Sequence, residues 1–576
     1  MKNILIILVI SMAILNGGVK KIDDWDDNVT KKETKRYKSF NPSPVRASSS
    51  MLGMGGDIAP VMMEATTIGF SVGGAKDTNN FYDNIKNGYL PKLSSITYEG
   101  QFYNHYFDTG IKKPCKALFC PSYSTAVSKN IYTDDKEYFL TVGLNSGIKE
   151  SDFKRKKLNI VVVLDISGSM GSSFDRYYYD TKGNKKRSDS SKSKMQIANR
   201  AIVDMITHLK DDDRLGVVLF DDRAYRAKPL RKIKYTDIKA IKRHILSIKD
   251  KGGTNWSEGY KKGLSLFKTI KLRKDYENRI IFITDAMPNR GELSRDGLFG
   301  LAKKASKKGI YTSFIGVGVD FNTDLVEYVS KTKGSNYYSV HSSKEFSKRL
   351  DREFDYMVTP MVFDLKLNFK SRGYKIVDIY GSPLANKKTG SIINIGTLFP
   401  SATNNSKVKG GVILLKLKKI RDSKDITLSV SYKNRDGKKY RNNQKIQFSN
   451  NIGYDNLGIK KAILVSNFVS LIKNWLADSR ALCNNKKIYS YNYLNPISQN
   501  KYFRYIKNWE YKSCNLRVTN GYKKLFNLFK RDFQKEMKII RDTSLNKELD
   551  ILDEIISKNR TSIDKILNQK RDDWQY

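Results

Sequence analysis

Histidine is scarce in this chain of 576 residues, which contains only four. His105, His208, His244 and His341 are scattered along the sequence and form no HExxH pair, which excludes zincin-type metal chemistry and gives little support to a histidine-based catalytic triad. The strings GxSxG, GxxxxGKS/T and GxGxxG are also absent. The sequence therefore lacks the nucleophile elbow of α/β-hydrolases and the phosphate-binding loops of nucleotide enzymes.

Acidic residues are few beside basic ones: 59 Asp and Glu against 105 Lys and Arg, a formal net charge of +46. This excess of basic residues predicts attraction to anionic surfaces. An AT-rich genome, which enriches lysine throughout a protein, would give the same numbers. A mean hydropathy of -0.53 excludes a polytopic membrane protein, whereas 39% hydrophobic and 11% aromatic residues suffice for packed cores. At roughly 100–200 residues per domain, the length corresponds to about three or four structural units.

The chain has no apolar run long enough for a pore, but its first residues are apolar. The sequence MKNILIILVISMAILN places one lysine before an apolar run from Ile4 to Leu15, which is the layout of a secretory signal. The run is too short to span a bilayer comfortably, and the mediocre cleavage site after it leaves an uncleaved membrane anchor as the alternative. We therefore expect an exported protein that is secreted, periplasmic or at the cell surface, and that meets a membrane only through this segment if the segment is uncleaved.

Cysteine is limited to four residues, which form two local couples. In an exported protein Cys115 can pair with Cys120, and Cys483 with Cys514, because each couple lies within one region of the chain. A proline on either side of the first couple favours a tight loop closed by a disulfide. Four unrelated thiols are the alternative.

The order of periodic segments predicts a multidomain α/β protein. From 155 to 355, apolar strands alternate with amphipathic helical segments, which is the pattern of a doubly wound, mainly parallel sheet. The strand LNIVVVLD at 158–165 is a β-branched run of the kind buried on both faces of such a sheet. The regions that we predict are a signal peptide or anchor (1–20), a linker (21–65), a mixed β segment (66–154), the α/β domain (155–355), a β-rich module (356–450) and a helical C-terminal region (451–576).

Strand-like segments lie on both sides of the α/β domain, before Arg155 and after Met361. Each flank alone offers few strands, and a sheet needs about three or more to be independently stable. The termini of doubly wound domains can lie close together. We therefore expect the α/β domain to be inserted into a β module that is made from both flanks.

A candidate metal site follows the strand at 158–165. Asp165, Ser167 and Ser169 come directly after this strand, so they lie at the carboxyl edge of the sheet, where open α/β folds bind their ligands. Thr254 in KGGTNWSEG and Asp285 at the end of NRIIFITD belong to two further strand-end loops. Hydroxyl and carboxylate oxygens suit Mg2+, Mn2+ or Ca2+ better than Zn2+. We predict that these five residues hold one divalent cation, with Mg2+ the first choice.

These five residues resemble the metal-ion-dependent adhesion site (MIDAS) of von Willebrand factor type A (VWA) domains. The pattern of that family is DxSxS, a threonine in a glycine-rich loop and an aspartate that ends the central strand. The resemblance implies a Rossmann-like fold and a cation held without a full shell of protein ligands, so that a carboxylate of a partner completes the coordination. The flanking segments look like those of bacterial exported proteins labelled Ca-activated chloride channel homologues, but we do not adopt that label because the chain has no pore-forming segment.

A polar segment at 171–194 departs from a minimal VWA domain and begins directly beside the metal loop. It contains Tyr177, Tyr178 and Tyr179 among basic residues, and such side chains often anchor interfaces. The segment is therefore either a lid that selects the ligand or a solvated excursion without a role.

The resemblance favours a binding module over an enzyme, namely an adhesion or protein-interaction protein whose partner supplies a carboxylate. A metal-assisted hydrolase is the alternative. Asp165 and Asp285 are expected at the cation, so only Asp221 and Asp222 remain as carboxylates in a strand-end loop. A third candidate function is the binding of an anionic polymer, either a nucleic acid or a cell-surface polysaccharide, through net charge. No motif predicts specific nucleic-acid recognition.

Overall fold

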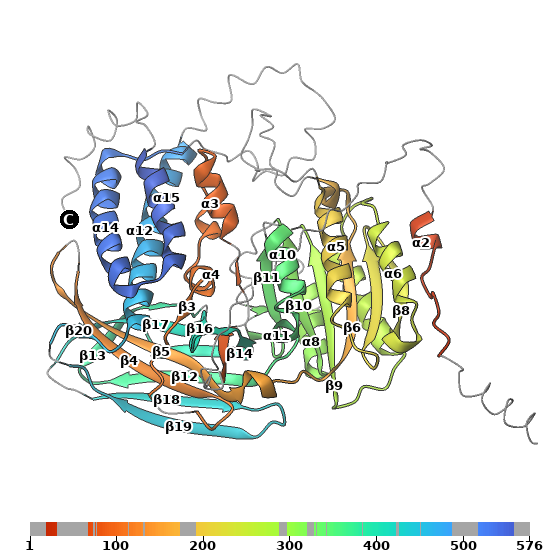
Figure 1. The fold of residues 1–576 in the computed structure, drawn as a ribbon, viewed down its shortest axis with the longest axis horizontal. Helices are drawn as coiled ribbons and strands as arrows, with labels where there is room; N and C mark the ends of the chain where they lie inside the picture. Colours follow the sequence, from red (N-terminus) through yellow and green to blue (C-terminus); the bar gives the residue numbers. More distant parts are fainter. Residues whose placement is uncertain are drawn as a thin grey trace, which may run out of the picture.

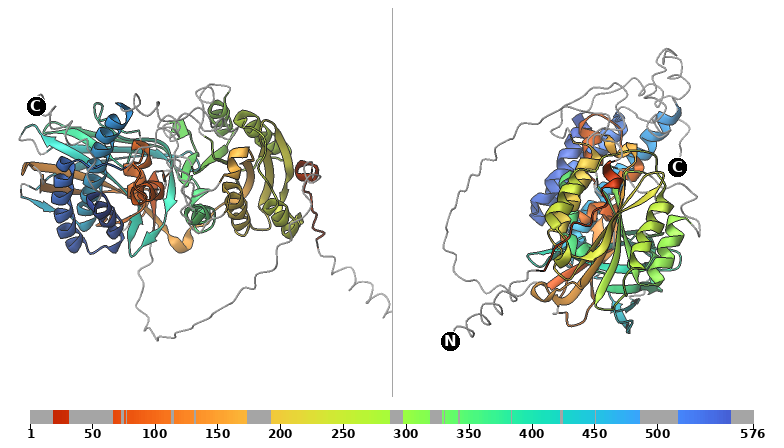
Figure 2. Two further views of the ribbon diagram at one scale, coloured as in Figure 1. Left: turned by 90° about the horizontal axis from the view of Figure 1, so that it is seen from above. Right: turned by 90° about the vertical axis from the view of Figure 1, so that its right-hand side faces the viewer.

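The computed structural model of the protein describes residues 19–31, 67–72, 75–76, 78–112, 115–130, 133–172, 192–286, 297–318, 328–329, 331–340, 343–382, 384–421, 425–449, 451–485 and 516–557. These residues form two main parts (Figure 1). One is a seven-stranded sheet covered by helices, and the other is a ten-stranded sheet with a helical layer beside it. The two parts lie next to each other along the long axis of the molecule, as the turned views confirm (Figure 2). Residues 1–18 of the predicted signal peptide or anchor lie outside the described residues.

The seven-stranded sheet forms the predicted α/β domain and has the order β2-β11-β10-β9-β6-β7-β8. Neighbouring strands from β2 to β7 run parallel, which confirms the mainly parallel sheet, while β8 at one edge runs antiparallel to β7. The strands are β2 (Ala75–Lys76), β6 (Lys157–Asp165), β7 (Arg214–Phe220), β8 (Ala224–Lys232), β9 (Tyr276–Thr284), β10 (Ile310–Val317) and β11 (Asn336–Val340).

Helices cover both faces of this sheet, so the domain is doubly wound as predicted. Alternate side chains of β6 enter two different cores, with Leu164 on one face and Val163 on the other. The first face is covered by α5 (Lys194–Ile206), α6 (Ile238–Leu246) and α10 (Ser343–Leu350), and the second by α7 (Trp256–Phe267) and α8 (Leu298–Lys307). The middle of β6, residues 160–164, is therefore continuously apolar, as expected for a strand that is covered on both faces.

The ten-stranded sheet is antiparallel and draws its strands from both sides of the α/β domain. Its main order is β13-β17-β5-β1-β14-β12-β18-β19, with β4 paired to β5 and β20 paired to β4. The strands before the domain are β1 (Thr67–Val72), β4 (Cys120–Lys129) and β5 (Lys136–Lys149); those after it are β12 (Val362–Ser371), β13 (Tyr374–Tyr380), β14 (Ser391–Ser401), β17 (Val412–Lys419), β18 (Ile426–Lys433), β19 (Lys439–Ile446) and β20 (Gly453–Tyr454). The insertion predicted from the sequence is therefore present, because β5 and β1 lie between β17 and β14.

The segment that leads into the α/β domain and the segment that leaves it touch each other. The guanidinium of Arg155 donates to Asp355 Oδ1 at 2.7 Å and to Asp213 Oδ2 at 2.7 Å. The rings of Phe153 and Tyr356 lie 5.1 Å apart. The two connections thus form one contact region at the edge of the sheet where the parallel strands begin.

A buried ionic cluster around Glu353 joins the α/β domain to a small three-stranded sheet. The Glu353 carboxylate accepts hydrogen bonds from Arg349 in α10, from Lys409 in the short strand β16 (Lys407–Lys409), and from the hydroxyl of Tyr103 at 3.2 Å. Burial opposes ionisation of this carboxyl, but the charges of Arg349 and Lys409 outweigh it and lower the pKa of Glu353 to about 2. β16 belongs to a small three-stranded sheet with β3 (Tyr106–Phe107) and β15 (Thr403–Asn404).

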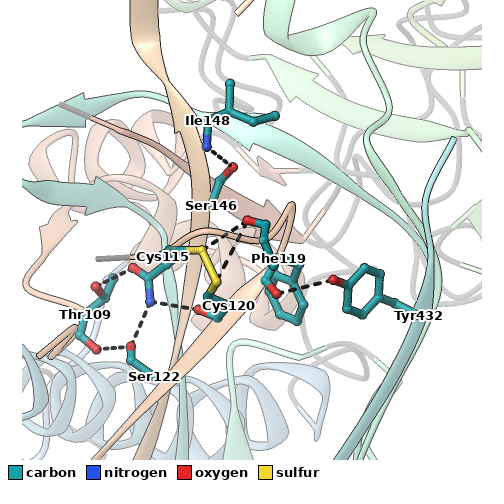
Figure 3. Close-up of a disulfide and its surroundings, with 10 residues drawn as sticks. Thr109, Cys115, Phe119, Cys120, Ser122, Ser146, Ile148 and Tyr432 are labelled. Carbon is teal, nitrogen blue, oxygen red and sulfur yellow. Dashed lines mark hydrogen bonds between the residues drawn. A yellow bond between two sulfur atoms is a disulfide. The ribbon is translucent and has the colours of Figure 1, made fainter. Parts of the chain in front are cut away.

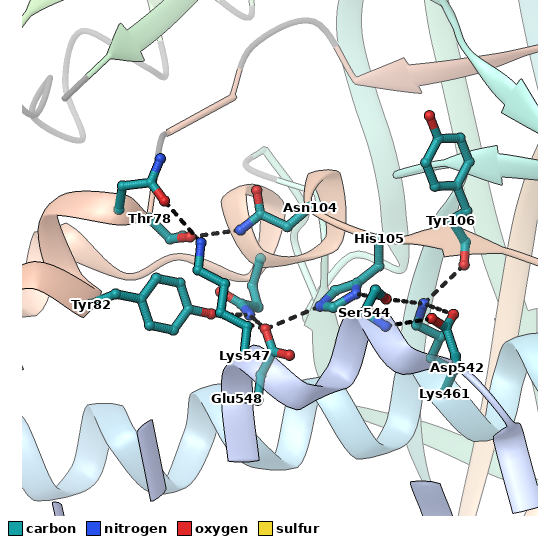
Figure 4. A network of polar contacts seen from close by, with 12 residues as sticks. Thr78, Tyr82, Asn104, His105, Tyr106, Lys461, Asp542, Ser544, Lys547 and Glu548 are labelled. Atoms are coloured by element: carbon teal, nitrogen blue, oxygen red, sulfur yellow. Dashed lines mark hydrogen bonds and ion pairs between the residues drawn. The ribbon is translucent and has the colours of Figure 1, made fainter. Parts of the chain in front are cut away.

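The C-terminal region is helical, as predicted, and packs with helices that precede the α/β domain. The long helices are α12 (Leu457–Asn485), α14 (Asn520–Ile540) and α15 (Asn546–Ser557), and the preceding ones are α3 (Asn79–Lys86) and α4 (Tyr98–Tyr103). Figure 4 shows the polar contacts between the two sets, in which Glu548 Oε1 accepts from Tyr82 at 2.9 Å and lies 3.2 Å from His105 Nε2. Among the described helices, none combines the length and the apolar character needed to cross a bilayer.

One of the two expected disulfides is present. Cys115 and Cys120 are bonded, with their Cα atoms 5.8 Å apart, in the loop that leads into β4 (Figure 3). The backbone carbonyl of Ala117 between them accepts the amide of Gly147, which ties the closed loop to β5. The side chain of Cys483 and the whole of Cys514 lie outside the described residues.

The first part of the predicted linker is packed on the α/β domain. Asp24 forms ion pairs with Lys228 Nζ at 3.2 Å and Arg231 Nε at 2.8 Å, both on the edge strand β8. Trp25 is buried and stacks on the ring of His244 with centroids 5.4 Å apart. The segment therefore covers the antiparallel edge of the sheet and continues into the short helix α2 (Asn28–Lys31).

Candidate metal centre

The turn after β6 gathers the first three predicted ligands. The backbone amide of Ser167 donates to Asp165 Oδ1 at 2.8 Å, and the hydroxyl oxygens of Ser167 and Ser169 lie 3.1 Å apart. A short 3-10 helix from Gly168 to Gly171 follows and ends the turn. Asp165 and Ser167 are buried, whereas Ser169 is exposed, so the oxygens run from the interior to the surface.

Asp285 comes from the neighbouring strand and completes a chain of hydrogen bonds. The Ser169 hydroxyl donates to Asp285 Oδ1 at 2.7 Å. Lys194 Nζ donates to Asp285 Oδ2 at 2.9 Å, and both side chains are almost fully buried. Four of the five predicted ligands are therefore in one hydrogen-bonded set, and a buried ammonium group lies beside it.

The environment of Asp165 holds its carboxylate in place. Its Oδ2 accepts a hydrogen bond of 2.6 Å from the hydroxyl of Thr284, the residue before Asp285. Burial and, after it, the nearby Asp285 carboxylate raise the pKa of Asp165 to about 7, although the hydrogen bonds from Thr284 and Ser167 oppose the rise. Each Asp165 oxygen thus has a protein donor, which leaves the carboxylate fixed in orientation.

The loop that carries Thr254 is bound to the turn after β6 through its backbone. Gly168 donates its amide to the carbonyl of Gly252 at 3.0 Å, and Lys251 donates to Ile166 at 2.5 Å. Gly252 has a φ of 69°, a conformation that favours glycine. Thr254 is exposed two residues further on, and these backbone contacts place its loop beside the turn that carries Asp165, Ser167 and Ser169.

Asp221 and Asp222, the carboxylates considered for a hydrolase, hold this loop in position. Asp222 Oδ2 accepts the amide of Gly253 at 2.9 Å, and a Cβ atom at Gly253 would lie 2.2 Å from Asp222 Oδ1. Asp221 accepts the amide of Arg223 at 2.8 Å through Oδ1. Both aspartates therefore have a structural role in positioning the loops beside the candidate metal centre.

Sequence reasoning missed Thr284, Lys194 and the role of Asp222. Lys194 is the first residue of α5, directly after the N-cap Ser193, whose capping box with Gln196 starts the helix. A positive charge in the first turn opposes the helix dipole, so its position was a signal that this lysine has a partner elsewhere. The other two residues carry no comparable signal, because hydroxyls and carboxylates are common at the ends of strands.

The comparison with protein families decides what this arrangement is. Residues 160–288 match the family described as the von Willebrand factor type A domain. They form a VWA domain. The match covers most of β6, the whole of β7, β8 and β9, and all five predicted ligands, and it confirms both the resemblance and the fold class.

Three relatives illustrate the range of similar proteins. Inter-alpha-trypsin inhibitor heavy chain H2 of Mus musculus is 24% identical over 250 residues, which are 42% of this chain and only 24% of that protein. A solved von Willebrand factor type A protein from Catenulispora acidiphila is 14% identical and covers 66% of this chain and 84% of its own, with a TM-score of 0.38. Proximal thread matrix protein 1 of the mussel byssus, described with a zinc-occupied MIDAS motif, is 20% identical over 35% of this chain and 46% of its own, with a TM-score of 0.26.

The donor set of the VWA domain fits a hard divalent cation. Two hydroxyl oxygens and two carboxylates converge from two strand ends, and this chemistry suits Mg2+, Mn2+ or Ca2+. Within the described part of the chain, no three His, Cys, Asp or Glu side chains gather as metal ligands. A cation at this site would therefore depend on the serine hydroxyls. The polar segment at 171–194 has residues 173–191 outside the described residues, including Tyr177, Tyr178 and Tyr179.

Proposed function

We propose that the protein is an exported, metal-dependent adhesion or protein-interaction protein. The observation that carries the proposal is the hydrogen-bonded set of Asp165, Ser167, Ser169 and Asp285 at the carboxyl edge of the parallel sheet. Its carboxylates are buried and its outermost hydroxyl is exposed. A cation held there has protein oxygens below it and an open position toward solvent, where a partner can bind.

The proposed ligands have different roles. Ser167 and Ser169 contact the cation through their hydroxyls, and Thr254, Asp165 and Asp285 contribute directly or through water. The two donors already present at Asp165 favour contact through water for this residue. Mg2+ is the first choice, with Mn2+ and Ca2+ as alternatives. When bound, the cation supplies a Lewis-acidic position for an incoming oxygen ligand.

The charges around the site support a partner that carries a carboxylate. Asp165 and Asp285 together roughly neutralise a divalent cation, and Lys194 offsets part of one carboxylate because it donates to Asp285. The site with a cation bound would therefore keep a net positive charge. The net charge of +46 assists the approach of an acidic partner, but salt screens this effect beyond about 8 Å, so it contributes to steering rather than to specificity.

A binding role is favoured over hydrolysis by what the nearby carboxylates do. A metal-assisted hydrolase needs a base to activate water. The side chains of Asp221 and Asp222 accept backbone amides of the loops beside the site. Both carboxylates are thus engaged in holding backbone, and the proposal assigns no catalytic residue.

Metal titration tests the proposal. Isothermal titration of the intact protein with Mg2+ should show one site, and the double variant Ser167→Ala with Ser169→Ala should lose at least tenfold in affinity. The control variant Ser247→Ala with Ser265→Ala should bind as the wild type does, because each of these hydroxyls donates only to the backbone of its own helix. Absence of Mg2+, Mn2+ and Ca2+ binding by the folded protein would contradict the proposal.

The partner is tested by capture from the envelope fraction of the host. Specific binding should require Mg2+ and disappear with EDTA or with the double serine variant, while added NaCl should mainly slow association. Equal capture in EDTA would show that another surface recognises the partner.

A further inference from the structure

A basic pocket of about 330 Å³ lies where the VWA domain meets the ten-stranded sheet. Its walls come from β12, β14, β18 and β19, and from Lys331, which precedes β11 in the VWA domain. This is the end of the domain where the parallel strands begin, opposite to the candidate metal centre. The charged side chains that line the pocket are Lys331, Lys366, Lys433, Lys439, Arg441 and a single carboxylate, Asp364.

The strand register aligns part of this lining in a row across the sheet. Asn394 on β14 pairs with Lys366 on β12, Lys366 pairs with Ser431 on β18, and Ser431 pairs with Arg441 on β19. The neighbouring residue Leu365 belongs to the core, so the row points to the opposite, outer face. Strands are about 4.8 Å apart, which places Lys366 and Arg441 on the order of 10 Å from each other across the row.

The carboxylate in the pocket is already paired. Asp364 accepts a hydrogen bond of 2.6 Å from Lys433. It lies in a β-bulge between Phe363 and Lys366, with a φ of 50°. Among the described residues, no carboxylate forms an ion pair with Lys366, Lys439 or Arg441. The pocket therefore keeps an uncompensated positive charge over an extended row.

The neutral side chains of the pocket favour an acidic polysaccharide over a nucleic acid. Asn394 and Ser431 alternate with the cations of the row and can bind hydroxyl groups. The two aromatic rings of the lining, Tyr432 and Tyr440, stack on each other with centroids 5.0 Å apart, and Lys438 lies 5.6 Å from the centroid of Tyr440. Each ring thus covers one face of the other, and Tyr432 is buried in the core, so the lining offers little aromatic surface for the stacking of nucleobases that strengthens binding of single strands.

We propose that this pocket binds an acidic polysaccharide, a linear polymer in which hydroxyl groups alternate with carboxylate or sulfate groups. The length of the row suits an extended chain better than a single small anion. The interaction needs no metal ion, because the one carboxylate of the lining, Asp364, is paired with Lys433 and the other charged groups are cations. It is independent of the function proposed for the metal centre, so the two can fail separately.

Binding of the full-length protein to defined polymers tests this proposal. The probes are polygalacturonate for carboxylates, dextran sulfate for sulfates, uncharged dextran, and duplex and single-stranded DNA, each at physiological salt and each with Mg2+ or with EDTA. The test variant is Lys366→Glu with Arg441→Glu. The control is Lys303→Glu with Lys307→Glu, which makes the same change in net charge on the exposed face of α8.

We expect at least a tenfold loss of affinity for polygalacturonate or dextran sulfate in the test variant, less than a twofold loss in the control, and no effect of EDTA. Circular dichroism melting and the Mg2+ titration should be unchanged in both, which shows that the fold and the metal centre are intact. Equal losses in both variants would overturn the proposal in favour of delocalised charge. Tighter binding of DNA through the same two residues, or no binding of either acidic polymer, would also overturn it.

Discussion

The two large sheets of this protein are built from the chain in opposite ways. Six of the seven strands in the VWA sheet come from one continuous stretch, 157–340, and only the two-residue strand β2 is added from elsewhere. The ten-stranded sheet instead joins strands from 67–149 with strands from 362–454. A sheet made from one stretch can form as soon as that stretch exists, whereas a composite sheet requires contacts of long sequence separation. The VWA domain should therefore be the autonomous part, and the composite sheet the dependent one.

The strongest test of this contrast is to separate the two parts, and it has the largest expected effect. Residues 361–450 alone lack β5 and β1, so β13 and β17 lose their connection to β14, β12, β18 and β19. We expect this fragment to be unfolded or aggregated, while residues 155–358 should unfold cooperatively. Circular dichroism melting with size-exclusion chromatography measures both. A cooperatively folded 361–450 fragment would show that the composite sheet does not depend on its first flank.

A smaller effect is expected where the two parts are joined. The folded-state pKa of Glu353 is about 2, below its ordinary value of 4.5. The ionised carboxylate therefore stabilises the fold above pH 4.5, and this contribution is lost as the pH falls from about 4.5 toward 2. Glu353→Gln should lower the free energy of unfolding at pH 7 by about 3 kcal/mol, the order expected when a buried ion pair loses one partner.

Chemical denaturation of the wild type and of Glu353→Gln from pH 7 to pH 2 measures this contribution. The difference between them should shrink across the acid range. A suitable control is Asp134→Asn, because the ion pair of Asp134 with Lys129 is exposed and should contribute little. A constant difference at all pH values would mean that Glu353 acts through packing rather than through its charge.

The smallest effect is expected at the candidate metal centre of the VWA domain, which is the part that we expect to fold on its own. Lys194 donates to Asp285 and offsets its charge, so Lys194→Met should raise the affinity for Mg2+ by about tenfold, or roughly 1.4 kcal/mol. Titration calorimetry measures the change, and Lys194→Arg should remain close to the wild type because it keeps the charge. Weaker Mg2+ binding by Lys194→Met would show instead that the lysine orients Asp285 for the cation.

The same contrast explains how much the sequence could predict. The apolar run of β6 and the residues that end β6 and β9 are local patterns, so the parallel sheet and the proximity of Asp165, Ser167, Ser169 and Asp285 were predictable. The insertion followed from counting strands on each side of the domain. Long-range contacts left no local pattern: β2 is two residues long, and Glu353 meets Lys409 across 56 positions. Trp25 lies in a charged segment without periodicity, and only its partners on the domain show why it is buried.

The insertion also has a mechanical consequence. A partner held at the proposed metal site would pull on the VWA domain from the side opposite to its two connections, so the load would pass into β5 and β12 at the same time. Both strands are hydrogen-bonded on either side, β5 to β17, β1 and β4, and β12 to β14 and β18. The hydrogen bonds of an antiparallel sheet run perpendicular to its strands, so a pull along β5 and β12 loads many of them in shear rather than opening them one by one. An inserted domain is in this sense anchored twice, and we expect it to bear tension better than a domain attached through one linker.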